Sequence, residues 1–203
     1  PALAPVMTMV LVVASEFMRR SLVAGIRGPR AHPEGAVENG AVTELTRLVR
    51  PTDAAELAEL YTANSEHLAP WDPARPEHFF TPAGQAEVLA TQLANYALGV
   101  AEPRVIVEGG RIVGRVNLSN IAYGPFRSAI LGYWVDRDCT GRGVASRAVA
   151  EMVAVAFEGL GLHRLEAGTL PHNLASQAVL ARNGFERFGY APHYLEIAGR
   201  FQD

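Results

Sequence analysis

Apolar residues recur along this chain at two spacings, and the two spacings alternate from one segment to the next. A period of two is typical of a half-buried strand, whereas recurrence at every third or fourth residue is typical of an amphipathic helix. Clusters of Gly, Pro, Asn and Asp interrupt these patterns and indicate turns. On these grounds helices are predicted over residues 54–61, 82–97, 144–156 and 173–182, and strands over residues 43–49, 104–108, 111–119, 130–136, 162–169, 185–190 and 194–199.

The order of the predicted elements is β-α-α-β-β-β-α-β-α-β, in which the last β stands for the two final strands over residues 185–190 and 194–199. This order predicts an α/β (α+β) domain in which a mixed sheet carries helices on both faces. A chain of 203 residues suits one such domain and is long enough to bury a substantial core.

The segment that precedes this domain differs from it in composition. Residues 6–14 are apolar but too few to span a bilayer, which takes about 20 residues. No basic residue precedes them, unlike the start of a signal peptide, so we expect a strand or helix that packs on the domain surface. Residues 25–40 are rich in Gly, Pro and Ala, as linkers are. We therefore predict an N-terminal extension and linker over residues 1–42 and one domain over residues 43–203.

Composition excludes several classes of function. The net charge of −3 lacks the excess of Lys and Arg that nucleic-acid binding needs, so no direct nucleic-acid partner is expected. A single cysteine, Cys139, rules out an intramolecular disulfide and favours a reducing compartment. We predict a cytoplasmic protein without a membrane partner. The six histidines show no metal-ligand spacing, so no metal is expected.

Residues 138–146, with the sequence Asp-Cys-Thr-Gly-Arg-Gly-Val-Ala-Ser, join a predicted strand to the helix that follows. Such a turn leaves backbone N–H groups unpaired at the positive end of the helix dipole, where an anion such as phosphate binds. Gly141 and Gly143 let the backbone approach a ligand closely, because they carry no Cβ. Glycines before a helix also serve turns that bind nothing, so this turn alone predicts an anion site only weakly.

Further short motifs surround this turn in a fixed order. They are Leu131–Asp136 (LGYWVD), Gly141–Ala145 (GRGVA), Leu165–Ala167 (LEA), Asn173 with Ser176, and Asn183–Phe185 (NGF). Together they resemble the GNAT superfamily of acyl-CoA N-acyltransferases, and within it the ribosomal-protein alanine N-acetyltransferases, over residues 43–200. The resemblance implies a mainly antiparallel sheet and acetyl transfer from acetyl-CoA to a primary amine. A protein N-terminal alanine or serine is the leading acceptor.

The resemblance assigns the glycine turn to the diphosphate of coenzyme A. The family has Gln or Arg where this chain has Thr140, which should matter little because the backbone supplies most donors. Asn173 is expected near the pantetheine or diphosphate and also as the N-cap of its helix. The backbone N–H of Val135 is expected to polarise the thioester carbonyl. The predicted coenzyme-binding residues are therefore Val135, Gly141, Arg142, Gly143, Val144, Ala145, Ser146 and Asn173.

For the chemistry, the resemblance implies direct transfer without a covalent enzyme intermediate, so Cys139 is not needed as a nucleophile. Glu166, on the strand after the coenzyme helix, is the leading candidate base; the alternative is an exposed carboxylate or a partner for Arg164. Many relatives use a tyrosine as the acid seven residues after the asparagine, where this chain has Leu180. Ser176 is expected instead to hydrogen-bond the leaving thiolate.

The acceptor amine is expected to bind beside the first two predicted helices. Trp71, Asp72 and Tyr133 are the predicted acceptor residues, although Tyr133 also fits a packing role. Phe79 and Phe80 are expected to cover the open edge of the sheet. Two alternatives stay open: an acetyltransferase for a small amine such as a polyamine or an antibiotic, and a non-catalytic sensor that binds acyl-CoA. A homodimer is also left open.

The C-terminal end of the predicted domain raises a further question. Relatives of this branch continue beyond the part that matches residues 199–203 into a last strand, which this domain is predicted to lack. Without that strand its neighbours would keep unpaired backbone edges. Three answers stay open: the chain extends further, a partner chain supplies the strand, or the apolar segment at residues 6–14 takes its place.

Overall fold

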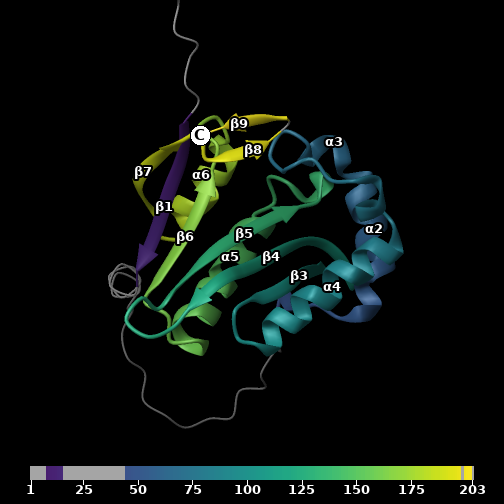
Figure 1. Ribbon diagram of the computed structural model, residues 1–203, viewed down its shortest axis with the longest axis horizontal. Helices are drawn as coiled ribbons and strands as arrows, with labels where there is room; N and C mark the ends of the chain where they lie inside the picture. The colour runs from purple at the N-terminus through teal and green to yellow at the C-terminus, as the bar shows by residue number, and fades with distance from the viewer. Residues whose placement is uncertain (1–7, 16–43, 198, 203) are drawn as a thin grey trace, which may run out of the picture.

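The computed structural model describes residues 8–15, 44–197 and 199–202, which form a seven-stranded sheet, a two-stranded hairpin and the helices that cover the sheet (Figure 1). The α-helices are α2 (Ala54–Ala63), α3 (Ser65–Leu68), α4 (Pro82–Ala97), α5 (Val144–Ala154) and α6 (Leu174–Arg182). The strands are β1 (Thr8–Ser15), β2 (Thr46–Leu48), β3 (Glu102–Glu108), β4 (Arg111–Ala122), β5 (Ser128–Val135), β6 (Arg164–Thr169), β7 (Glu186–Pro192), β8 (Leu195–Ile197) and β9 (Arg200–Gln202).

The strands of the large sheet lie in the order β2-β3-β4-β5-β6-β1-β7. Every neighbouring pair is antiparallel except β5 and β6, which run parallel, so the predicted mixed and mainly antiparallel sheet is confirmed. Pairing between β5 and β6 covers three residue pairs, from Ser128↔Arg164 to Ile130↔Glu166. Beyond these pairs the two strands diverge, and the later half of β5 faces the opening between them.

Apolar side chains hold helices against both faces of the sheet, as the alternating pattern predicted (Figure 1). On one face, α5 contributes Val149 and Met152, both fully buried, to the larger of two core clusters. On the other face, α2 and α4 contribute Leu57 and Leu89, also fully buried. Each such side chain stabilises the fold by about 1.5–3 kcal/mol. Within the described ranges no helix is long and apolar enough to cross a bilayer.

Strand β1 occupies the position between β6 and β7. It pairs antiparallel with β6, from Val10↔Thr169 to Ser15↔Arg164, and antiparallel with β7 along its other edge. The sequence left open which segment takes the place of the missing last strand. In the structure the N-terminal apolar segment supplies it, as β1. Part of the predicted extension is therefore a strand of the domain's own sheet, whereas residues 1–7 and 16–43 lie outside the described residues.

Two elements differ from the sequence-based expectation. The strand predicted over residues 194–199 is instead the hairpin β8–β9, because Gly199, with a φ of +73°, turns the chain back on itself. Helix α3, which follows α2 after the single residue Asn64, is not among the helices predicted from the sequence.

Candidate functional site

The glycine turn lies between the end of β5 and the start of α5. Gly141 and Gly143 have φ values of +71° and +76°, and Gly143 is the N-cap of α5. Only glycine adopts such angles readily, which explains why both positions are glycine. Asn64 holds the segment that leads into the turn, because its buried side-chain oxygen accepts a hydrogen bond from Arg137 N at 2.9 Å.

The backbone amides of this turn are free to bind a ligand. Among the described residues, no backbone acceptor engages the amides of residues 141–146, and the first helical bond of α5 runs from Arg147 N to Gly143 O at 3.1 Å. No atom lies within 4 Å of a Cβ built on Gly141 or Gly143, so both face open space. Free amides at a helix N-terminus bind anions, and this geometry supports the predicted phosphate site.

A cavity of about 600 Å³ extends from this turn past the end of β5 to α6. Its walls are the turn, the end of β5, the inward side of α6 and the segment around α3. All the predicted site residues line it except Arg142, Glu166 and Asp72. The lining residues are His67, Leu68, Trp71, Tyr133, Trp134, Val135, Cys139, Thr140, Gly141, Gly143, Val144, Ala145, Ser146, Asn173, Ala175, Ser176, Ala178, Val179 and Arg182.

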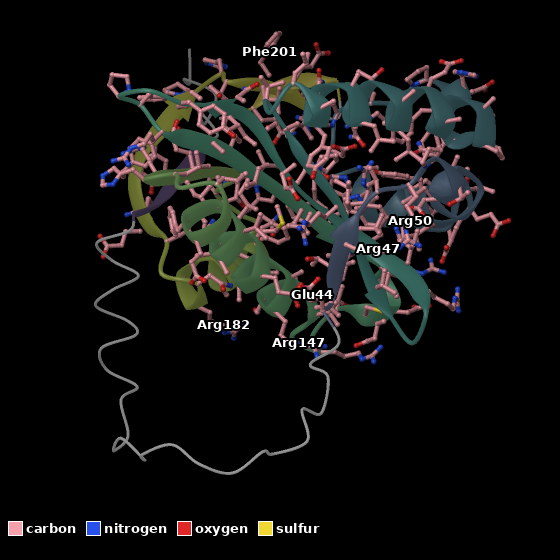
Figure 2. All side chains as sticks on the ribbon, turned by 90° about the horizontal axis from the view of Figure 1, so that it is seen from below. Glu44, Arg47, Arg50, Arg147, Arg182 and Phe201 are labelled. Carbon is pink, nitrogen blue, oxygen red and sulfur yellow. The ribbon has the colours of Figure 1, made fainter. Side chains whose placement is uncertain are left out.

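The cation in this cavity is Arg182 rather than the predicted Arg142. The Arg142 guanidinium turns to Glu108, at 2.9 Å, and Glu108 also holds Arg147 at 3.2 Å. Arg182 lines the cavity, and no acidic residue of the described ranges forms an ion pair with it. Figure 2 shows Arg182 and Arg147 on the same side of the molecule, on α6 and α5. Arg182 can therefore meet an anion in the cavity without first breaking an ion pair.

Backbone direction along β5 agrees with the role predicted for Val135. Asp136 N donates to Val113 O of β4 at 2.8 Å. Because successive N–H groups of a strand point to opposite neighbours, the Val135 N–H points away from β4 and into the opening. Gly114 of β4 lies opposite Val135, and a Cβ there would meet Trp134 O at 2.3 Å. The two strands can thus approach this closely only because residue 114 is a glycine.

Two hydroxyl groups meet where the cavity passes between β5 and α6. The Tyr133 hydroxyl lies 2.9 Å from Ser176 Oγ and 3.1 Å from the Ser176 carbonyl oxygen. Burial raises the pKa of Tyr133 to about 12, although the hydrogen bond with Ser176 acts in the opposite direction. Asn173 Oδ1 accepts from Ser176 N at 3.0 Å, which confirms the predicted N-cap. Leu180 is buried in the core, so it presents nothing to this site.

Glu166 lies outside the cavity lining. Its carboxylate accepts a hydrogen bond from Arg164 Nε at 2.6 Å, which is the ion pair named as the alternative to a catalytic role. The Cys139 thiol is buried behind the turn, and burial raises its pKa despite the nearby Arg142 guanidinium. A thiol with a raised pKa is a poor nucleophile at neutral pH, in line with the expectation for Cys139.

The predicted acceptor residues divide between two cavities. Trp71 and Tyr133 line the large cavity, and the Trp71 ring lies 5.3 Å from the ring of His172, which comes from the loop before α6. Asp72 lines a smaller cavity of about 190 Å³ and is paired with Arg75. This smaller cavity shares Leu68 with the large one, and Phe79 and Phe80 form part of its wall.

Sequence reasoning missed several cavity residues on α6. Ala175, Val179 and Arg182 follow one another at intervals of four and three residues and so share one face of the helix with Ser176. Counting in steps of three from Ser176 gives Val179 and Arg182, so helical spacing could have found these two but not Ala175. Within the described residues, no group of three or more His, Cys, Asp or Glu could hold a metal ion.

Comparison with known sequences agrees with this site. The family model described as acetyltransferase (GNAT) domain matches residues 44–186. The [ribosomal protein uS5]-alanine N-acetyltransferase of Escherichia coli strain K12 is 33% identical over 165 residues, which cover 78% of this chain and 83% of the relative. A probable N-acetyltransferase of Bacillus subtilis, YjcK, is 32% identical over 167 residues, which cover 78% of this chain and 90% of the relative.

Solved structures lead to the same family. The ribosomal-protein-S5-alanine acetyltransferase from Vibrio fischeri has a TM-score of 0.75 and 36% identity, covering 77% of this chain and 87% of that one. Mycobacterium smegmatis RimJ, solved in complex with CoA-disulfide, has a TM-score of 0.75 and 34% identity, covering 77% of each chain. With the family model matching more than half of its length, the chain belongs to the GNAT acetyltransferase family.

Proposed function

We propose that this chain transfers an acetyl group from acetyl-CoA directly to the N-terminal amine of a protein, with alanine or serine as the first acceptor residue. The observation that carries the proposal is one cavity that joins the free amides of the glycine turn to the end of β5, which is not paired with β6 beyond Ile130. The turn accounts for an anionic diphosphate, and the opening accounts for an extended pantetheine arm that leads to the reacting carbonyl.

Residues 141–146 would hold the diphosphate with their backbone amides, as predicted for this turn. Arg182 would add a charge-assisted hydrogen bond to a phosphate, because it lines the cavity and forms an ion pair with none of the acidic residues that the structure describes. Arg142, which was also predicted to bind the coenzyme, would contribute chiefly its backbone amide while Glu108 holds its guanidinium. Asn173 lines the same cavity and orders the first turn of α6 around the arm.

The Val135 N–H would donate a hydrogen bond to the thioester carbonyl oxygen as negative charge develops on it. A fixed donor aimed at a developing oxyanion is worth about 10²–10³ in rate in well-studied acyl transfers. β5 is suited to hold this donor in place because β4 pairs with it as far as Gly114↔Val135. The attacking nitrogen forms its bond to the carbonyl carbon, and the electron pair of the broken C–S bond leaves with the sulfur.

The acceptor ammonium must lose a proton before it can attack. His67 is the one histidine among the residues that line the cavity, and a histidine side chain can take up a proton as a general base. We therefore place His67 ahead of Glu166 as the base, since the Glu166 carboxylate is held by Arg164 outside the lining. Replacing His67 with Gln should lower kcat more than Glu166→Gln does. The reverse order would restore Glu166 as the base.

A protein acceptor is favoured over a small amine by the relatives, whose names describe them as acetylating alanine of ribosomal protein uS5 or S5. Trp71 lines the cavity and its ring contacts the ring of His172, and the first residues of an entering peptide would lie beside this pair. A pure sensor of acyl-CoA would need the glycine turn but not two hydroxyl groups beside the sulfur. The Tyr133–Ser176 pair therefore favours catalysis.

An acceptor screen tests the proposal. Thiol release from acetyl-CoA would be followed with peptides that begin with Ala or Ser, with the same peptides blocked at the N-terminus, and with polyamines and aminoglycosides. We expect turnover with the free Ala or Ser peptides only. Turnover confined to a small amine would favour the small-molecule alternative, and tight coenzyme binding without any turnover would favour the sensor.

A further inference from the structure

Tyr133 was predicted to contact the acceptor amine, but its hydroxyl is directed elsewhere. It lies 2.9 Å from Ser176 Oγ and 3.1 Å from the Ser176 carbonyl oxygen. The two residues come from opposite walls of the cavity, Tyr133 from β5 and Ser176 from α6. Their contact therefore bridges β5 and α6, two residues before Val135, whose N–H the proposed function assigns to the thioester carbonyl.

The number of hydrogens in this pair limits what Ser176 can do. A serine hydroxyl has one hydrogen to donate, and a tyrosine hydroxyl also has one. If the Tyr133 hydrogen points at Ser176 Oγ, the Ser176 hydrogen is free to point into the cavity. If the Tyr133 hydrogen points at the Ser176 carbonyl oxygen instead, the serine can donate to the tyrosine oxygen. A negatively charged sulfur in the cavity favours the first arrangement, because charge-assisted hydrogen bonds are about twice as strong as neutral ones.

The surroundings of Tyr133 suit a fixed donor. Its ring is packed against the larger core cluster, which restrains the position of the hydroxyl. Burial raises its pKa to about 12, so the phenol keeps its hydrogen at any working pH. Ser176 is restrained as well, because its backbone amide is bonded to the Asn173 side chain. Neither hydroxyl needs a large rearrangement to serve a ligand beside the pair.

We propose that Tyr133 is a positioning residue for the leaving group: it donates to Ser176 Oγ and so directs the Ser176 hydrogen to the thiolate. The inference rests on the proposed function and deepens it. In this step the C–S bond breaks and its electron pair stays on the sulfur. Tyr133 and Ser176 stabilise that charge through a chain of two hydrogen bonds, and neither transfers its proton. Chains of this kind polarise one another and strengthen each bond.

Tyr133→Phe tests this role, because it removes the hydroxyl and keeps the ring that packs in the core. We expect kcat to fall about tenfold, the value of one lost hydrogen bond in the transition state. The Kd of coenzyme A by calorimetry and the thermal midpoint should stay close to those of the unmodified chain. Tyr96→Phe is the matched control: it removes a half-exposed hydroxyl on α4, outside the cavity lining, and should leave kcat unchanged.

The double variant Tyr133→Phe/Ser176→Ala separates positioning from an independent effect. If Tyr133 acts through Ser176, the double variant will be no slower than Ser176→Ala alone. Losses that multiply would overturn the proposal, as would full activity of Tyr133→Phe or a defect confined to coenzyme affinity. These results leave the proposed function intact as long as the unmodified chain acetylates its peptide. An unmodified chain that binds coenzyme A without turnover would instead refute the proposed function together with the role of Tyr133.

Discussion

Gly114→Ala should displace the Val135 N–H, the proposed donor to the thioester carbonyl, although residue 114 itself does not line the cavity. A Cβ at residue 114 would lie 2.3 Å from Trp134 O and 2.9 Å from Val135 Cα, both backbone atoms of β5. Bringing the first contact to 3.4 Å, where ordinary van der Waals contact begins, requires β4 and β5 to separate by about 1 Å. Overpacking of this kind costs about 1–3 kcal/mol of stability. A displacement of 1 Å in a reacting group lowers the rate by up to about 100-fold.

The assay for this variant combines urea unfolding with steady-state turnover of acetyl-CoA and an Ala peptide. We expect lower stability and a kcat that falls by more than the affinity for coenzyme A does. Gly132→Ala is the control on β5, the strand that carries Val135, because no atom lies within 4 Å of its added Cβ and its φ is not left-handed. That control should keep both stability and kcat. Unchanged kcat in a folded Gly114→Ala protein would refute the assignment of the donor to Val135.

Three further predictions concern binding and stability. Gly143→Val forces a left-handed φ on a branched residue in the turn, so coenzyme affinity by calorimetry should fall below detection; an unchanged Kd would defeat the phosphate assignment. Arg182→Gln should weaken coenzyme binding about tenfold, and Arg142→Gln much less. Burial acts to raise the pKa of Asp53, but hydrogen bonds from Arg47 and the Arg50 amide outweigh it and lower the pKa. Asp53 therefore stabilises the fold above pH about 4, and this contribution is lost as pH falls further, so Asp53→Asn should flatten the acid limb of stability.

Features fixed by neighbouring residues were open to prediction from sequence. An N-cap needs only a suitable side chain three residues before the backbone amide from which it accepts a hydrogen bond. In α6, Asn173 accepts this bond from the amide of Ser176. The glycine turn follows from two glycines between a strand and a helix, and both adopt left-handed angles. α4 begins and ends at the predicted residues because Thr81 caps it and Pro82 starts it.

Features fixed by distant partners were not open to prediction in the same way. Arg142 points to Glu108 on β3 instead of the turn, a choice that depends on the packing of β3 beside α5. Trp71 meets His172 from a loop far along the chain, and no local pattern links the two. The hydrogen bond between Tyr133 and Ser176 likewise forms only when β5 and α6 are packed together. Sequence could name these residues but could not say which of them touch.

The central claim is that this chain moves an acetyl group from acetyl-CoA to a peptide α-amine. Mass spectrometry of an Ala-initiated peptide, incubated with acetyl-CoA and the protein, tests it most directly when the modified atom is located by fragmentation. The account predicts one added acetyl group on the N-terminal nitrogen, formed by the unmodified chain and abolished by Gly143→Val. An unmodified peptide, or an acetyl group found only on a lysine side chain, would contradict it.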